Sequence, residues 1–303
     1  MDLKIENATG AELGNGGIWE LKSTLDYVDS WPLMKSPVPI FAIWATYIVF
    51  VLKAGPQYMK NRPAFGLHSV LILYNLIQVL YSIYIVYVGL SLLRPIGYVH
   101  LSCNLDKDTS RQIANGIYIY FLAKLSEFLD TIFFVLRKKQ NQVSFLHVYH
   151  HSVMLWATWL TLKFEPTYST IFLGTLNSFV HVIMYSYYGL SAFPSLSKYL
   201  WWKKYITTMQ LLQFGMVIVH TFVNGITSEC PPSYILLSTI TINASILIYL
   251  FGDFYVQSYL KKKNNECTVK LSNGKHSNGQ ANGHSNVFES VHSKSNGADK
   301  KEL

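Results

Sequence analysis

Residues 146–152 have the sequence LHVYHHS and lie inside an otherwise apolar stretch. His147, His150 and His151 are three and four residues apart, so a helix places their imidazoles on one face. A histidine inside a membrane segment is costly, and its default interpretation there is functional. The first hypothesis is therefore a polar site that has this helix face as one wall.

The composition predicts an integral membrane protein. The 303 residues are 50% hydrophobic, 15% aromatic and only 14% charged, and the mean hydropathy is +0.21, which is unusual for a soluble domain. The residues before position 36 are polar or mixed, unlike a secretory signal peptide. The net charge of +8 does not indicate nucleic acid, because the basic residues lie between apolar segments and form no stripe with stacking aromatics.

Seven apolar stretches approach the length of about 20 residues that crosses a hydrocarbon core. They are predicted near residues 37–52, 66–92, 114–136, 143–162, 169–190, 205–226 and 234–258. The predicted fold class is an all-α multi-pass membrane protein with seven transmembrane helices. Its parts are a luminal segment 1–35, a transmembrane domain 36–263 and a tail 264–303, which is rich in Ser, Asn and Gly and is predicted to be disordered.

The Lys and Arg residues between these stretches predict the orientation, because cytosolic loops are enriched in them. One side carries twelve: Lys53, Lys60, Arg62, Arg137, Lys138, Lys139, Lys198, Lys203, Lys204, Lys261, Lys262 and Lys263. The other side carries four: Arg94, Lys107, Arg111 and Lys163. We therefore expect a luminal or external N-terminus and a cytosolic C-terminus.

Both ends of the chain agree with this orientation. Asn7 begins a glycosylation sequon on the predicted luminal side. Lys300 and Lys301 lie four and three residues from the predicted cytosolic C-terminus and resemble a dilysine retrieval signal, although the alternative is the charged end of a disordered tail. The predicted location is the endoplasmic reticulum membrane.

Three further predicted helices carry polar side chains that a lipid-facing surface would not tolerate. They are Lys124, Glu127, Asp130 and Thr131 in the third helix, Asn177, His181, Met184, Tyr185 and Tyr188 in the fifth, and Thr207, Gln210 and Gln213 in the sixth. With a rise of about 1.5 Å per residue, all of them lie with the histidines at one level in the cytosolic half. We expect a shared polar chamber, although an i,i+3 Lys–Glu ion pair and interhelical hydrogen bonds are purely structural alternatives.

Three chemistries fit such a chamber. Clustered histidines can bind a metal, as in membrane di-iron oxygenases, but those enzymes use several histidine clusters and this chain has one. A histidine can also act as a general base or as a nucleophile that forms an acyl-imidazole. The third possibility is a binding pocket without chemistry, as in a seven-helix receptor.

Four motifs resemble those of the ELO family of very-long-chain fatty acid elongases. They read KxxExxDT at 124–131, HxxHH at 147–151, NxxxHxxMYxYY at 177–188 and TxxQxxQF at 207–214. The likeness runs from about Trp31 to Lys263 and is greatest to animal members that act on very-long-chain and polyunsaturated acyl groups.

The resemblance implies a very-long-chain 3-oxoacyl-CoA synthase, an acyltransferase. It would condense an acyl-CoA with malonyl-CoA, release carbon dioxide and CoA, and lengthen the chain by two carbons. Helices two to seven would surround an acyl tunnel that is closed at the luminal end, with helix one outside. No cofactor is implied beyond the two CoA substrates, and no metal.

The resemblance also implies roles for individual residues. His150 and His181 would face the thioester carbon, one as acyl acceptor and the other assisting. The supporting residues would be His147, His151, Asn177, Gln210 and Gln213 for orientation or oxyanion binding, Lys124, Glu127 and Asp130 for holding the third helix, and Tyr185. Lys203 and Lys204 would bind the CoA phosphates.

The implied partners follow from the same reaction. They are acyl-CoA, malonyl-CoA, membrane lipid, and the ketoacyl reductase, dehydratase and enoyl reductase of the elongation cycle. A second copy of the chain is a further expected partner, as a homodimer, and nucleic acid is not one. Chain-length preference and the identity of the acyl-accepting histidine stay open.

We predict a disulfide between Cys103 and Cys230. Both fall in loops on the oxidising luminal side, whereas Cys267 falls in the cytosolic tail. Mass spectrometry without reduction should recover a cross-linked peptide that contains both residues. Recovery of both as free thiols would show that the prediction is wrong.

Overall fold

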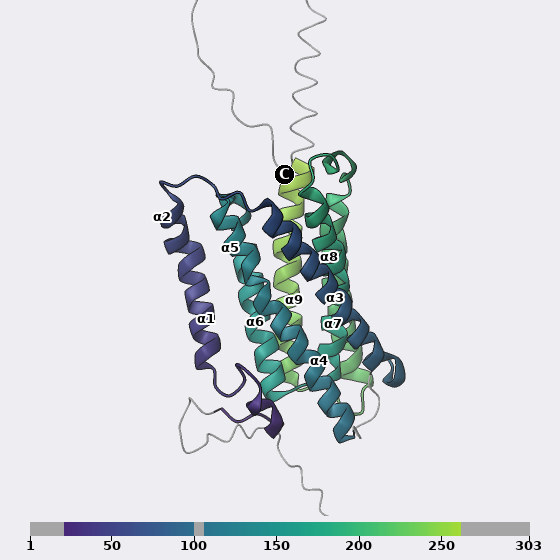
Figure 1. Cartoon of the computed structure of the whole chain (residues 1–303). Coiled ribbons are helices and arrows are strands. Elements are labelled where there is room, and N and C mark those ends of the chain that lie inside the picture. Colours follow the sequence, from purple (N-terminus) through teal and green to yellow (C-terminus); the bar gives the residue numbers. More distant parts are fainter. Residues whose placement is uncertain (1–20, 100–105, 262–303) are drawn as a thin grey trace, which may run out of the picture.

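The computed structural model describes residues 21–99 and 106–261, which are built from helices (Figure 1). Asn7, Cys103, Lys300, Lys301 and the predicted disordered tail lie outside the described residues. The glycosylation, retrieval and tail predictions therefore stay predictions.

Seven long helical segments follow one another along the described chain, close to the predicted stretches. They are α1 (Val38–Val49) with the π-helical η3 (Phe50–Ala54) and α2 (Gly55–Met59); α3 (His68–Ile96); α4 (Lys107–Ser126) with α5 (Phe128–Leu136); α6 (Phe145–Phe164); α7 (Tyr168–Ser191); α8 (Lys203–Thr227); and α9 (Tyr234–Tyr255) with the π-helical η6 (Val256–Lys261). Three short 3₁₀ turns, η2 (Asp26–Ser30), η4 (Gln140–Gln142) and η5 (Ser197–Tyr199), lie between or before them.

Four of these segments are long and apolar enough to cross a membrane: Val38–Met59, His68–Pro95, Lys203–Thr227 and Tyr234–Lys261. Large apolar side chains such as Leu73, Val219 and Tyr249 are more than half exposed on them, as expected of surfaces that face lipid. The other three segments carry the histidines and the other charged groups of the predicted chamber. The chain is thus a multi-pass membrane protein.

Six of the segments pack in a closed circuit. α3 packs on α7, α7 on α8, α8 on α9, α9 on α6, α6 on α4, and α4 on α3, while α4 also contacts α7 across the circuit. The first segment stands to one side in Figure 1 and contacts α5 through η3 and α2. The end of the bundle at which α9 finishes is called the C-terminal end below, and the opposite end, where α1 begins, the N-terminal end.

Side-chain caps fix where several helices begin. Asp106 accepts a hydrogen bond from the backbone N–H of Thr109 at 3.3 Å at the start of α4, and Ser144 accepts one from His147 at the start of α6. Such caps satisfy N–H groups that have no partner inside the helix. Hydrogen bonds from the Thr109 side chain and backbone lower the pKa of the Asp106 carboxyl below its usual value.

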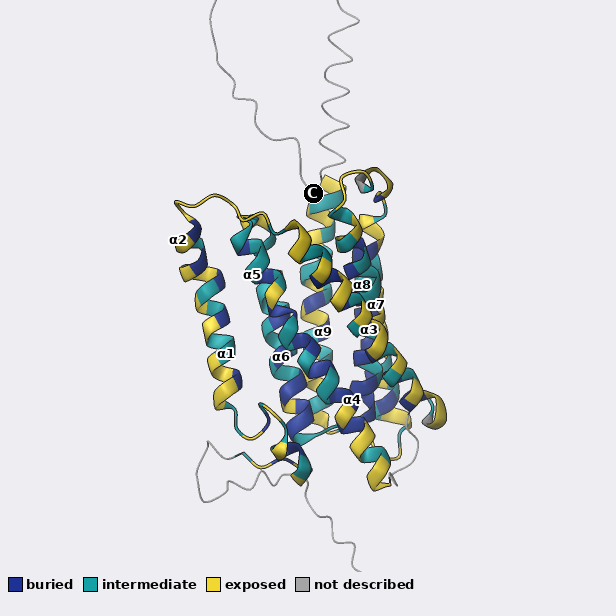
Figure 2. Ribbon diagram, in the orientation of Figure 1, coloured by how far each residue is buried: buried dark blue, intermediate teal, exposed yellow. Residues whose placement is uncertain are grey.

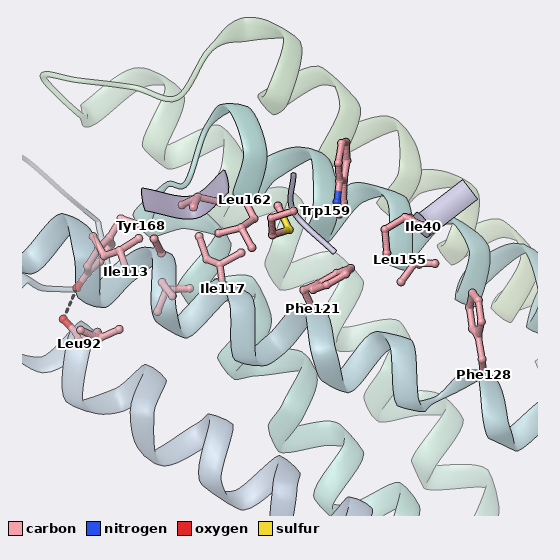
Figure 3. Packing of buried hydrophobic residues seen from close by; sticks show 14 of the residues in the cluster. Ile40, Leu92, Ile113, Ile117, Phe121, Phe128, Leu155, Trp159, Leu162 and Tyr168 are labelled. Atoms are coloured by element: carbon pink, nitrogen blue, oxygen red, sulfur yellow. Dashed lines mark hydrogen bonds between the residues drawn. The ribbon is translucent and has the colours of Figure 1, made fainter. Parts of the chain in front are cut away.

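The main apolar core lies between α1, α4, α6 and the segment that precedes α1. Ile117, Phe121, Leu155 and Trp159 are buried in it (Figure 3). Figure 2 shows the buried residues gathered on the facing sides of α4, α6 and α7. The Trp159 indole N–H donates to the carbonyl of Leu33 at 2.9 Å, so this core also fixes the segment before α1.

The structure corrects the expected environment of several basic residues. Lys163 was expected in a loop, but it lies in the last turn of α6, is fully buried and forms an ion pair with Asp29. Its ammonium also donates to the Met34 carbonyl at 2.7 Å. Lys53, Arg94, Lys107 and Arg111 were likewise expected in loops and lie inside helices, because those helices extend beyond the apolar stretches.

The contact between α3 and α7 predicts different tolerance for two helical glycines. A Cβ at Gly89 would lie 1.8 Å from the Thr175 hydroxyl oxygen, whereas one at Gly215 of α8 would meet nothing within 4 Å. We expect Gly89→Ala to lower the free energy of unfolding by about 1–3 kcal/mol through overpacking, and Gly215→Ala to leave it unchanged or raise it by up to about 1 kcal/mol. Thermal unfolding of the detergent-solubilised protein would measure both, and equal stability of the two variants would contradict the packing argument.

Candidate active site

The third helical segment is broken at Glu127, where the sequence predicts a continuous helix. Glu127 ends α4 and precedes α5, and the Asp130 N–H bonds to the Glu127 carbonyl in a tight turn. Two α3 side chains contact the break: Gln78 donates to the Ser126 hydroxyl at 2.9 Å and Tyr74 to the Ser126 carbonyl at 3.4 Å. The freed backbone group is therefore satisfied inside the bundle, as lipid surroundings require.

The Glu127 carboxylate is the centre of a buried charge network. Its Oε1 accepts from Lys124 Nζ at 2.8 Å and lies 3.1 Å from His181 Nδ1. Lys124 also donates to Asn177 Oδ1 at 2.7 Å, and the Tyr120 hydroxyl donates to the same oxygen at 2.9 Å. The side chains of Lys124 and Glu127 are only 2% and 3% exposed. Two helices, α4 and α7, and the break between α4 and α5 thus contribute to one hydrogen-bonded charge pair.

The three histidines of α6 share a face but have different neighbours. His147 Nε2 lies 3.0 Å from the Thr131 hydroxyl. His151 Nδ1 lies 3.9 Å from Glu127 Oε2, which is beyond hydrogen-bonding distance. His150 packs edge-on against Phe251 of α9 with ring centroids 6.4 Å apart, and its Nδ1 has no hydrogen-bond partner among the described residues. The three imidazoles therefore lie in three different environments.

Two other predicted residues pair with each other at the same level. The hydroxyl of Tyr185, a fully buried residue, donates to Asp130 Oδ2 at 2.7 Å. On α8, Gln210 Nε2 contacts the sulfur of Met184 at 3.6 Å, and Gln213 is buried. In the described part of the chain, neither glutamine hydrogen-bonds to a histidine or to Glu127. The structure thus brings α4, α5, α6 and α7 together through direct bonds, and α8 through packing.

Several polar atoms at this level are buried without a partner. Among the described residues they include Glu127 Oε2, His150 Nδ1, His151 Nδ1, Ser152 Oγ and Gln213 Oε1. A buried polar group without a hydrogen bond costs about 1–3 kcal/mol, so a cluster of them requires an explanation. Hydrogen-bonding groups of a bound polar ligand would satisfy them.

The donor geometry favours acid–base or nucleophilic chemistry over metal ligation. No group of three His, Cys, Asp or Glu side chains within residues 21–99 and 106–261 is arranged to hold a metal ion. His181 Nδ1 faces a carboxylate instead, and His147 Nε2 faces a hydroxyl. A histidine whose Nδ1 is held by a carboxylate keeps Nε2 available for proton transfer.

The remaining predicted site residues lie away from the chamber. Lys203 and Lys204 are exposed at the start of α8, at the C-terminal end of the bundle. Cys230 lies in the loop between α8 and α9 and is disulfide-bonded. Cys103, the partner that we predict for it, is outside the described residues, so this pairing stays a prediction.

Sequence reasoning missed four residues that contact the site: Tyr47, Tyr74, Gln78 and Tyr120. Gln78 carried a usable signal, because an amide inside an apolar span is costly unless it is bonded. Tyr47, Tyr74 and Tyr120 carried none, since a tyrosine in a membrane helix resembles ordinary core or interface packing.

Comparisons with a family model and with individual known proteins point to the same family. Residues 32–267 match the family described as ELO: GNS1/SUR4 family. The chain is similar to very long chain fatty acid elongase 2 of Mus musculus, with 46% identity over 238 residues that cover 78% of this chain and 80% of the relative. It is 42% identical over 257 residues to very long chain fatty acid elongase 4 of Homo sapiens, covering 83% and 81%. It is 38% identical over 290 residues to very long chain fatty acid elongase 7 of Drosophila melanogaster, covering 88% and 85%.

The charge pair predicts non-additive effects on stability. Glu127→Gln leaves the buried Lys124 ammonium without its carboxylate, which should cost about 3–5 kcal/mol. Lys124→Met combined with Glu127→Gln removes both charges and should be less destabilised than Glu127→Gln alone. Thermal unfolding in detergent of the two single variants and the double variant would measure this coupling. Additive losses would show that the two side chains do not act as a pair.

Proposed function

The chain belongs to the ELO (GNS1/SUR4) family of very long chain fatty acid elongases, and we propose that it catalyses the condensing step of fatty acid elongation. In this reaction a long-chain acyl-CoA and malonyl-CoA give a 3-ketoacyl-CoA that is two carbons longer, with release of CoA and carbon dioxide. The single observation that carries the proposal is the buried Glu127 carboxylate beside His181, together with His150, whose Nδ1 has no partner among the described residues. The names of the relatives support elongation, and this geometry supports acyl transfer.

His150 is proposed as the acyl acceptor. An imidazole nitrogen attacks the thioester carbon, the carbon–sulfur bond breaks, and CoA leaves as a thiolate that takes up the proton released by the acylated ring. Nδ1 of both His150 and His151 is buried and forms no hydrogen bond within the described chain, but His151 lies beside Glu127 whereas His150 packs against Phe251. Burial shields the acyl-imidazole from hydrolysis.

His181 is proposed to move the proton. Its Nδ1 is held by Glu127, which leaves Nε2 to carry the proton from the acylated His150 to the departing thiolate. Lys124 donates a hydrogen bond to Glu127 and a second one to Asn177, so Asn177 holds the ammonium that holds the carboxylate. His181 would thus be a base whose ring is oriented by the buried Glu127 carboxylate.

The second half of the reaction needs donors for a developing enolate. Decarboxylation of the malonyl group forms this enolate, its carbon attacks the acyl carbon, and the carbon–nitrogen bond to His150 breaks. The departing imidazole takes up the one proton that the overall reaction consumes, which regenerates neutral His150. Asn177 uses its carbonyl oxygen for Lys124 and Tyr120, so its amide N–H groups are left to donate. Gln210, Gln213 and His151 are the further candidate donors on neighbouring helices.

The circuit of six helices supports a place for the substrates. We propose that the acyl chain lies inside the circuit, extending from the chamber toward the N-terminal end. The CoA phosphates would lie at the C-terminal end, where Lys203 and Lys204 are exposed. We propose that this end faces the cytosol in the endoplasmic reticulum and that the later steps are carried out by separate reductases and a dehydratase. No cofactor is proposed beyond the two CoA substrates.

The alternatives are less well supported. A seven-helix receptor does not require a buried lysine, carboxylate and histidine network, and a di-iron oxygenase requires several histidine ligands around each iron. Family membership favours neither alternative.

The proposal predicts a covalent intermediate that depends on His150. Purified protein incubated with acyl-CoA alone should gain the mass of the acyl group, and addition of malonyl-CoA should convert this adduct to 3-ketoacyl-CoA with release of carbon dioxide. His150→Ala should lose both adduct and product, and His181→Ala should form the adduct far more slowly. His68→Ala, which removes an exposed histidine at the start of α3, is the matched control and should retain both activities.

Two outcomes would count against the proposal. Wild-type protein that consumes no malonyl-CoA in the presence of acyl-CoA would refute the condensing activity. An active His150→Ala protein would refute only the assignment of the acyl acceptor.

A further inference from the structure

The first helical segment reaches the histidine face although it stands outside the circuit of six helices. Tyr47 of α1 is 4% exposed, and its ring stacks on Phe128 of α5 with centroids 3.9 Å apart and planes at 15°. The Tyr47 hydroxyl lies 2.8 Å from the Thr131 hydroxyl oxygen. The phenol is thus held in place by an aromatic contact and a hydrogen bond.

Thr131 connects this phenol to the site. It is 0% exposed, and its hydroxyl oxygen lies 3.0 Å from His147 Nε2 as well as 2.8 Å from Tyr47. One hydroxyl on α5 therefore joins α1 to α6. Neither Tyr47 nor Thr131 has another side-chain hydrogen bond among the described residues.

The number of available protons sets the direction of this chain of hydrogen bonds. A threonine hydroxyl has one proton and accepts through its lone pairs, and a tyrosine hydroxyl likewise has one proton. If Tyr47 donates to Thr131, Thr131 donates to His147 Nε2 and both protons are used. If the chain ran the other way, the buried Tyr47 proton would have no acceptor within the described residues, which is the costly arrangement.

We propose that Tyr47 and Thr131 are positioning residues that hold His147 in the tautomer with its proton on Nδ1 and its Nε2 lone pair toward Thr131. Within the described residues, Nδ1 of His150 and Nδ1 of His151 are buried atoms without a partner, whereas Nδ1 of His147 is not one of them. The proposed tautomer thus places the His147 proton on a nitrogen that is not buried without a partner. This arrangement also fixes the His147 ring against His151, with centroids 4.3 Å apart. Because His151 faces Glu127, the peripheral helix helps to define the environment of the charge network.

Close packing keeps α1 where this relay requires it. A Cβ at Gly55 would lie 2.7 Å from a Val135 methyl of α5 and 2.7 Å from the Phe50 carbonyl, so only glycine allows this approach. Trp44 packs edge-on against Trp156 of α6 at 6.3 Å. The π-helical turn η3 lies between Tyr47 and Gly55, and such turns are frequent near functional sites.

Tyr47→Phe tests the inference because it keeps the stack on Phe128 and removes only the hydroxyl. Thr131→Val removes both hydrogen bonds at nearly constant shape. Tyr58→Phe, at a half-exposed tyrosine of α2, is the matched control on the same helical segment. The two readouts are ¹⁵N spectra of histidine-labelled protein, which distinguish the imidazole tautomers, and steady-state condensation kinetics, which rest on the proposed function.

The expected spectrum has an unprotonated His147 Nε2 in the wild type and in Tyr58→Phe, with mixed tautomers in Tyr47→Phe and Thr131→Val. Assignment follows from the signal that disappears in His147→Asn. The expected fall in kcat is about three- to tenfold, the equivalent of one hydrogen bond, with the KM for malonyl-CoA unchanged. The Tyr47→Phe/Thr131→Val double variant should be no slower than Thr131→Val.

Each contrary result has a separate meaning. A protonated Nε2 in the wild type, or a tautomer unchanged by Tyr47→Phe, would overturn the relay whatever the activity is. Multiplied losses of kcat in the double variant would also overturn it. Wild-type protein without condensing activity would refute the proposed function, while the spectra would still decide whether Tyr47 and Thr131 set the tautomer.

Discussion

The arrangement of this bundle depends on one buried carboxylate. Glu127 lies among helices whose other faces are apolar, and placing an ion there costs several kcal/mol unless partners compensate it. Lys124 supplies the opposite charge, and Asn177 Oδ1 accepts hydrogen bonds from both the Lys124 ammonium and the Tyr120 hydroxyl. His181 then contacts the same carboxylate oxygen as Lys124. A group that is expensive to bury is thereby surrounded by four side chains from two helices.

The backbone is adapted to this carboxylate. Glu127 is the one residue between α4 and α5, where a tight turn interrupts the helical hydrogen-bond pattern. α3 supports the break through Gln78 and Tyr74, and α3 itself is seated against α7 by the absence of a side chain at Gly89. The geometry around Glu127 is therefore coupled to helix contacts that carry no charge. The polar site is therefore held in place by contacts between helices as well as by its own charges.

The sequence predicts the helices and the level of the site well, and the neighbours of individual side chains poorly. Helical periodicity sufficed to place His147, His150 and His151 on one face and to bring Glu127 and His181 to the same depth, because rise per residue and helix length are nearly constant. The first and third predicted segments are shorter than the helices in the structure, because those helices continue into polar residues at their ends. The break at Glu127 and the role of Tyr47 were not predictable, because both depend on which side chain of a distant helix fills a particular space. For the same reason Gln210 and Gln213 lie at the expected level but hydrogen-bond to none of the histidines in the described chain.

The three histidines show why a shared face does not imply a shared role. His147 lies 3.0 Å from the Thr131 hydroxyl, which also contacts Tyr47 of α1. His151 lies beside the Glu127 carboxylate without bonding to it, and His150 packs against Phe251 with an Nδ1 that forms no hydrogen bond in the described chain. A metal site would require these rings to converge on one point, whereas their neighbours draw them toward different helices. An acyl-transfer site has a different requirement, because one imidazole nitrogen must be free to react. Identical residue types in one motif thus have different surroundings: within the described residues Nδ1 of both His150 and His151 lacks a hydrogen-bond partner, but only His151 lies beside a carboxylate.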